Sequence, residues 1–258
     1  MLQFDAETTA ILDAGYAGSD VSARRRATFD VLRPQPGETI VDVGCGNGWL
    51  TCDLARAVGP RGRRLGVDPS ADMLRAGRER CAGFDTVSFA EGSAETLPLA
   101  DGTADRAVST QVFEYIADVA PALAALRRVL RPGGLAVVSD MHFDNWAWHS
   151  DTPDRMRRMK DSWDRHLADR QSGGTLPAAF RRAGFDAVDV QPFTITDCVL
   201  RPDGLARVLM ILMRRFAIDN GHLPEAEADA WYEEQHALAR EGRFFFSRTQ
   251  MIVWGRNP

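Results

Sequence analysis

Cysteine is scarce in this sequence, and its four copies, Cys45, Cys52, Cys81 and Cys198, include no C-x-x-C pair. Disulfide-stapled domains and zinc sites need clustered or regularly spaced cysteines. The spacing therefore predicts a reduced, intracellular protein with neither a disulfide framework nor a zinc site. No other set of side chains has metal-ligand spacing, so no metal is expected.

Long apolar runs and an excess of positive charge are also missing. No run approaches the roughly 20 residues of a transmembrane helix, and residues 1–7 lack the basic and apolar segments of a secretory signal. The 36 acidic and 31 basic residues leave a net charge of −5, which argues against binding to nucleic acid or an anionic membrane. We expect a cytoplasmic protein; its oligomeric state stays open.

Length and composition are ordinary for a globular enzyme. The chain has 258 residues, of which 45% are hydrophobic and 26% charged. That is enough for one large α/β core, and one domain with insertions is favoured over two domains.

The most informative stretch is a short apolar run followed by three glycines. Residues 40–43 are rich in β-branched side chains and predict a buried strand. Gly44, Gly46 and Gly48 follow, and then Leu50, Leu54 and Val58 share one face of a helix. A strand, a glycine turn and a helix bring bare backbone close to a ligand at the helix N-terminus.

An acidic residue ends the next apolar run, about 20 positions after the glycines. This residue is Asp68, which follows residues 65–67. A carboxylate at the end of the second strand can accept hydrogen bonds from both hydroxyls of a ribose. The two features together predict a cofactor that contains a nucleoside.

Residues 41–48, Val-Asp-Val-Gly-Cys-Gly-Asn-Gly, resemble the first motif of class I S-adenosylmethionine-dependent methyltransferases, in the small-molecule (type 11) subgroup. Their glycine spacing is G-x-G-x-G, which differs from the G-x-G-x-x-G of nicotinamide enzymes. Residues 92–98, 105–111 and 126–134 continue the resemblance, which covers residues 32–140.

Strands and helices alternate along the chain. Strands are expected near residues 40–43, 65–67, 87–89, 107–109, 135–138, 185–196 and 244–254. Helices are expected near residues 8–12, 22–32, 50–58, 70–80, 119–130, 153–170, 176–183, 203–216 and 224–242. This order predicts a doubly wound, mostly parallel sheet.

The resemblance implies a Rossmann-like α/β fold of seven strands, whose last strand is antiparallel, with helical insertions over the acceptor site. The expected divisions of this single domain are a helical lid over residues 1–36, a cofactor core over 37–140 and an acceptor region over 141–258.

The same resemblance implies the residues of the S-adenosylmethionine site: Tyr16, Asp42, Gly44, Cys45, Gly46, Gly48, Asp68, Pro69, Met73, Gly92, Ser93, Ala94 and Gln111. In many relatives an acid stands at the position of Ser93, so here the backbone of Ala94 is expected to meet the adenine. Tyr16 and the neighbouring Arg24-Arg25-Arg26 are lid candidates. The alternative is that the tyrosine packs and the arginines form a solvated face.

Two pairs of residues are candidates for acceptor chemistry. His142 and His149 lie in an aromatic-rich loop after the fifth strand, where histidine suits a general base at neutral pH. Glu114 and Tyr115 stand where some relatives orient an amine acceptor. For either histidine taken alone, the favoured interpretation is a loop residue bonded to backbone or solvent.

The predicted activity is methyl transfer from S-adenosylmethionine to a small organic acceptor by in-line displacement, for which orientation matters most. Two alternatives stay open. One is a protein that binds S-adenosylmethionine without transferring its methyl group, and the other is a nicotinamide-dependent oxidoreductase, which the glycine spacing disfavours.

Overall fold

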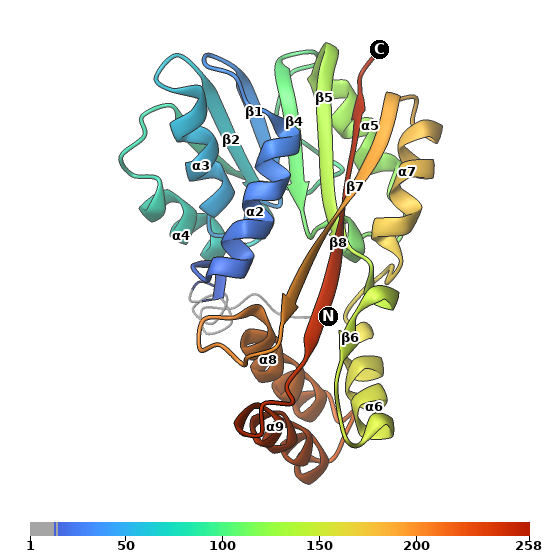
Figure 1. The fold of residues 1–258 in the computed structure, drawn as a ribbon. Helices are drawn as coiled ribbons and strands as arrows, with labels where there is room; N and C mark the ends of the chain where they lie inside the picture. Colours follow the sequence, from blue (N-terminus) through green and yellow to red (C-terminus); the bar gives the residue numbers. More distant parts are fainter. Residues whose placement is uncertain (1–12, 14) are drawn as a thin grey trace.

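One mixed sheet organises the computed structural model, which describes residue 13 and residues 15–258. Its strand order is β3-β2-β1-β4-β5-β8-β6, and β7 also pairs with β8. The strands are β1 (Thr39–Val43), β2 (Arg63–Asp68), β3 (Val87–Glu91), β4 (Ala104–Thr110), β5 (Leu130–Met141), β6 (Ala147–Trp148), β7 (Asp186–Asp197) and β8 (Phe246–Arg256). Figure 1 shows these strands side by side.

The fold class expected from the sequence is confirmed. Strands β1 to β5 are parallel, and β8 runs antiparallel between β5 and β7. An eighth strand, the two-residue β6, was not predicted; it forms because the aromatic loop after β5 returns to pair Trp148 with Phe246.

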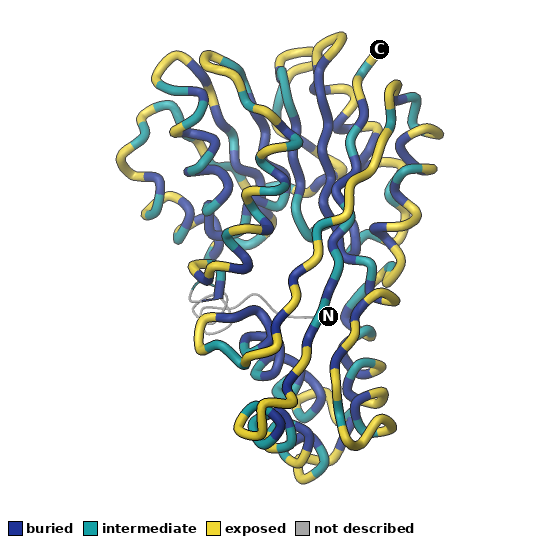
Figure 2. The backbone as a smooth tube through the Cα atoms, in the orientation of Figure 1, coloured by how far each residue is buried: buried dark blue, intermediate teal, exposed yellow. Residues whose placement is uncertain are grey.

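Helices cover both faces of this sheet (Figure 1). They are α2 (Ser19–Leu32), α3 (Trp49–Val58), α4 (Ala71–Arg80), α5 (Ala120–Val129), α6 (Pro153–Asp164), α7 (Ser172–Arg182), α8 (Leu205–Asp219) and α9 (Glu225–Arg240). Ile40 packs with side chains of α2 and α3, whereas Val41, the next residue, packs with α5 and α7. This follows from the alternation of side chains along a strand. Figure 2 shows the central strands buried and β7 largely exposed.

A third cluster of buried side chains lies beyond the carboxyl ends of the parallel strands. It joins α6, α8 and α9 around Trp148, Trp231 and Phe246, and it forms the lower part of the molecule in Figure 1. The parallel sheet and this helical cluster therefore face each other across the end of the sheet where α/β proteins bind ligands.

Helix boundaries differ from expectation around Gly173 and Gly174. The predicted helix 153–170 ends at Asp164, and the next helix begins at Ser172 rather than 176. The two glycines lie in its first turn because side chains there would collide: a Cβ on Gly173 would be 3.0 Å from the carbonyl oxygen of Asp140. The helix predicted at residues 8–12 lies outside the described residues. Among the described helices, none is both long and apolar enough to span a membrane.

Candidate functional site

A cavity of about 430 Å³ opens at the carboxyl ends of β1, β2, β3 and β4. Nearly all the residues expected at the cofactor site line it: Tyr16, Asp42, Gly44, Cys45, Gly46, Asp68, Pro69, Met73, Gly92, Ser93, Ala94 and Gln111. Gly48 does not. The structure thus brings together turns that are far apart in the sequence, as expected where parallel strands end at one edge.

The three glycines of the first turn have left-handed backbones but different surroundings. A Cβ on Gly44 would be 2.1 Å from Cγ2 of Val112, and one on Gly48 would be 3.0 Å from the Cα of Gly77 in α4. Gly46, at φ 51°, has nothing within 4 Å of its Cβ position and lines the cavity. Gly44 and Gly48 therefore allow neighbouring segments to pack closely against the turn, whereas Gly46 leaves room for a ligand.

Asp68 ends β2 and fixes the glycine turn. Its Oδ2 accepts a hydrogen bond from the backbone of Gly46 at 2.9 Å, and its Oδ1 accepts one from Ser70 at 2.9 Å. The residue is 8% exposed, and burial raises the pKa of its carboxyl group. Each carboxylate oxygen keeps a second lone pair, so Asp68 can still accept hydrogen bonds from a ligand in the cavity.

A second acid, Asp42, lies below the turn. Its Oδ2 accepts a hydrogen bond from Oγ1 of Thr51 at 2.6 Å, and burial raises its pKa to about 7. This carboxyl group changes protonation near neutral pH, and it lines the cavity.

The turns after β3 and β4 complete this side of the cavity. The backbone N–H of Gly92 donates to the carbonyl oxygen of Asp68 at 3.2 Å, and the Ser93 hydroxyl lies 3.1 Å from that of Thr96. Gln111 has a left-handed backbone, with φ 56°. Its backbone N–H donates a hydrogen bond to the carbonyl oxygen of Ser139 at 2.9 Å. Such a conformation is strained for a residue with a side chain and is typical of binding sites.

Glu114 and Tyr115 also line the cavity. The Oε2 of Glu114 accepts a hydrogen bond from the backbone of Met141 at 3.1 Å. Burial, and then the neighbouring Asp140, raise the pKa of Glu114 to about 8. Burial also raises the pKa of Tyr115 well above its usual range. At neutral pH both groups are therefore mainly protonated.

Neither histidine of the candidate pair lines the cavity. His142 is half-buried beside α7, where a Cβ on Gly174 would lie 2.9 Å from its Cε1. His149 is exposed, with Nε2 3.7 Å from Oδ1 of Asp151. The loop that carries them turns away after Phe143, which does line the cavity.

The cavity is also lined by residues that were not anticipated from the sequence, among them Trp163, His166 and Arg248. His166 is buried, its Nδ1 contacts the carbonyl oxygen of Trp163, and burial lowers its pKa to about 4. One signal was available for Arg248. Strand β8 alternates buried and half-buried residues, so Arg248 shares the inward face with Phe246 and Gln250.

The three consecutive arginines of α2 separate into three environments. Arg24 is buried and lines the cavity, Arg25 pairs with Asp53 at 2.8 Å, and Arg26 forms an exposed pair with Asp30. The solvated-face alternative therefore describes Arg26 but not Arg24. Tyr16 is half-buried and lines the cavity beside them.

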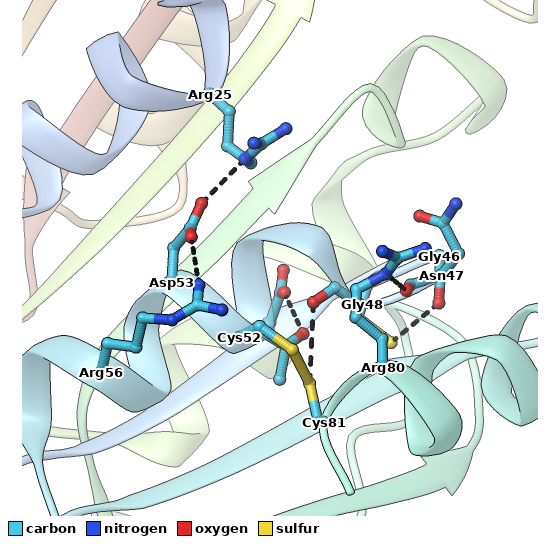
Figure 3. The surroundings of a disulfide bond; sticks show 12 residues. Arg25, Gly46, Asn47, Gly48, Cys52, Asp53, Arg56, Arg80 and Cys81 are labelled. Carbon is cyan, nitrogen blue, oxygen red and sulfur yellow. Dashed lines mark hydrogen bonds and ion pairs between the residues drawn. A yellow bond between two sulfur atoms is a disulfide. The ribbon is translucent and has the colours of Figure 1, made fainter. Parts of the chain in front are cut away.

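The expectation of a protein without disulfides is wrong in the structure. Cys52 of α3 is bonded to Cys81, just after α4 (Figure 3). The pair is invisible to motif spacing because the two helices bring together residues 29 positions apart. The Sγ of Cys81 also lies 3.8 Å from the carbonyl oxygen of Gly48. The disulfide therefore ties both helices together beneath the glycine turn. Within the described residues, no group of histidine, cysteine or carboxylate side chains could hold a metal ion.

Comparison with known proteins gives this site a context. Residues 41–138 match the family model described as a methyltransferase domain. An uncharacterized 37.1 kDa protein of transposon TN4556 from Streptomyces fradiae is 35% identical over 87% of this chain and 64% of its own length. Arsenite methyltransferase of Halobacterium salinarum is 33% identical over 61% of this chain and 39% of its length. This chain thus spans less than two thirds of either relative.

Solved structures share the fold at low sequence identity. The YcgJ protein of Bacillus subtilis aligns with a TM-score of 0.61 at 18% identity, covering 91% of this chain and 98% of that one. Phosphoethanolamine N-methyltransferase 2 of Haemonchus contortus, in complex with S-adenosyl-L-methionine, aligns with a TM-score of 0.57 at 14% identity. That alignment covers 92% of this chain and 53% of the other.

Proposed function

We propose that this chain, whose residues 41–138 match a methyltransferase domain, is a class I S-adenosylmethionine-dependent methyltransferase that methylates a small organic acceptor. One observation supports the proposal above all others. A single cavity is lined both by the glycine turn with Asp68 and by side chains of α8 such as Leu209 and Leu212. Cofactor and acceptor can therefore meet in one cavity.

The residues on the cofactor side fit S-adenosylmethionine. Gly46 leaves open space where a side chain would stand, and the free lone pairs of Asp68 suit two ribose hydroxyls. The backbone at Ala94 suits the adenine edge. Arg24 is a buried cation whose Nη1 has no hydrogen-bond partner among the described residues, and it suits the methionine carboxylate.

When bound, S-adenosylmethionine supplies a methyl group on a positively charged sulfur. The protein has to align the acceptor atom, exclude water and tolerate that charge. The aromatic faces of Tyr16 and Tyr115 are available beside the cavity to stabilise a cation. The lid of residues 1–36 and the region of residues 141–258 are proposed to exclude water from the two sides.

Glu114 is the group that we propose to receive a proton or hydrogen bond from the acceptor. It lines the cavity, and its pKa of about 8 lies near the working range of a general base. His142 and His149 remain secondary candidates because they lie outside the cavity lining. Tyr115 is proposed to orient the acceptor beside Glu114.

Methyl transfer itself is tested with tritiated S-adenosylmethionine and a library of small acceptors that includes amines, phenols, carboxylic acids and thiols. We expect tritium in at least one acceptor, and none when Glu114→Gln replaces the parent enzyme. Tight cofactor binding without transfer to any acceptor would favour the non-methylating binder. Binding of a nicotinamide nucleotide in place of S-adenosylmethionine would favour the oxidoreductase.

A further inference from the structure

Two buried guanidinium groups line the cavity, Arg24 from α2 and Arg248 from β8. They are 4% and 3% exposed. Among the described residues, neither guanidinium pairs with a carboxylate or donates a hydrogen bond, and Nη1 of Arg24 and Nε of Arg248 are sealed without an acceptor. A buried charge is costly unless it is paired. Both guanidinium groups therefore need an anionic partner, and the described residues supply none by direct contact.

A buried polar network ties α2 to β8, the two elements that carry these arginines. One helical turn after Arg24, the Thr28 hydroxyl accepts a hydrogen bond from Nε2 of Gln250 at 3.2 Å and donates to Ser139 at 3.1 Å. Gln250 follows Arg248 on the same face of β8. Burial lowers the pKa of Arg248 to about 10; the charge of Glu114 opposes this shift and that of Arg24 adds to it. Arg248 still stays charged at neutral pH.

Each carboxylate near Arg248 already contacts another group, although Oδ1 of Asp164 has no hydrogen-bond partner among the described residues. Glu114 accepts from the backbone of Met141, and its raised pKa leaves it mainly protonated. Asp140 accepts from the backbone of Val112 at 3.2 Å and from the Ser172 hydroxyl. Asp164 pairs with Arg170 at 3.2 Å. No neighbour therefore neutralises Arg248 by direct contact within the described part of the chain.

S-adenosylmethionine has one carboxylate, which satisfies one guanidinium. Arg24 belongs to α2 and lies near Tyr16, and we have placed it on the cofactor. Arg248 lies against the acceptor region instead: its Cζ is 4.4 Å from the ring centre of Phe143 and 5.1 Å from that of Trp146. The second guanidinium is thus left for the other substrate.

The surroundings of Arg248 are otherwise apolar, with one further donor. Leu209 and Leu212 of α8 line the cavity, as does Trp163, whose Nε1–H has no hydrogen-bond partner among the described residues. Such a wall suits an apolar or aromatic body, and the guanidinium suits an oxyanion at one end.

We propose that Arg248 binds an oxyanion, a carboxylate or a phosphate, on the apolar methyl acceptor. This rests on the proposed function, because it assigns the second substrate of the same cavity. Arg248 acts as a specificity residue that holds the acceptor by its charged end.

Calorimetry on protein saturated with S-adenosylhomocysteine tests the proposal, because that product occupies the cofactor side. The probes are benzoate, phenyl phosphate and the neutral benzamide, at constant ionic strength. We expect benzoate or phenyl phosphate to bind at least about tenfold more tightly than benzamide. Preference for benzoate would identify a carboxylate, and preference for phenyl phosphate a phosphate.

Two variants test whether the preference for anionic probes comes from Arg248. Arg248→Met should abolish the preference, whereas Arg256→Met, an exposed arginine on the same strand, should keep it. Arg248→Met should not lower the melting temperature, since it removes an unpaired buried charge; a purely structural arginine would give a clear decrease. The comparison of probes on the parent protein stands even if this variant does not fold.

The outcomes separate the two proposals. Failure of S-adenosylhomocysteine to bind would overturn the proposed function. Binding of that product with benzoate, phenyl phosphate and benzamide equally weak would overturn the assignment of Arg248 alone. A preference for the anions that survives in Arg248→Met would overturn it as well.

Discussion

Replacing Asp68 by asparagine is the sharpest test of the cofactor side, because the shape is kept and the charge is removed. In the structure both carboxylate oxygens accept backbone hydrogen bonds, at 2.9 Å from Gly46 and 2.9 Å from Ser70. An amide offers one oxygen only, and its NH2 group faces a backbone donor. A ribose that used the two remaining lone pairs would lose one charge-assisted hydrogen bond and keep a weaker one.

The expected loss is about 2–4 kcal/mol, since hydrogen bonds to charged groups contribute about 1.5–3 kcal/mol each. That corresponds to a roughly 30- to 900-fold weaker affinity for S-adenosylhomocysteine, measured by calorimetry. Asp72→Asn, in the exposed ion pair with Arg75, is the matched control and should leave the affinity unchanged.

The stability of Asp68→Asn should change little, which separates binding from folding. Burial raises the folded pKa of Asp68 above its unfolded value. Its protonation therefore stabilises the fold below the unfolded pKa, and that contribution is lost as pH rises through the folded pKa. At neutral pH the substitution removes both the cost of burying a charged carboxylate and one hydrogen bond to the backbone, so the two effects on stability oppose each other. An affinity within about threefold of the parent would refute the assignment.

Three further expectations follow from the same geometry. Gly46→Ala should weaken S-adenosylhomocysteine binding about tenfold or more, whereas Gly59→Ala, also at a positive φ of 67° but remote from the cavity, should leave that affinity unchanged. Single-turnover methylation should rise with pH through about 8, because the raised pKa of Glu114 keeps its carboxyl protonated below that value; a flat profile would exclude it as the base. Denatured, unreduced protein should expose two thiols rather than four, and replacing Cys52 and Cys81 by serine should lower the unfolding free energy by about 3–4 kcal/mol; four reactive thiols would disprove the bond.

The cofactor half was predictable because its signals are local. Apolar runs, the turn at Gly44 and Gly46, and Asp68 at the end of the next strand each depend on neighbouring residues. Parallel strands then place their carboxyl ends together regardless of the side chains elsewhere. The alternation of strand and helix therefore predicted a mostly parallel sheet with its ligand site at the carboxyl ends of the strands.

The acceptor half was predictable only in outline, because its contacts are between distant segments. Arg248 reaches the cavity through the antiparallel pairing of β8 inside the sheet. His166 reaches it because α6 ends at Asp164 and the chain turns back. His142 was a reasonable candidate by position, yet its side chain lies beside Gly174. Tertiary packing, rather than sequence spacing, decides which residues of this region line the cavity.

A crystal structure of the protein with S-adenosylhomocysteine tests the central claim most directly. We expect the ribose hydroxyls on the carboxylate of Asp68, the adenine beside Ala94 and the amino-acid carboxylate on Arg24. A nucleoside bound elsewhere, or a ribose with no contact to Asp68, would contradict the account.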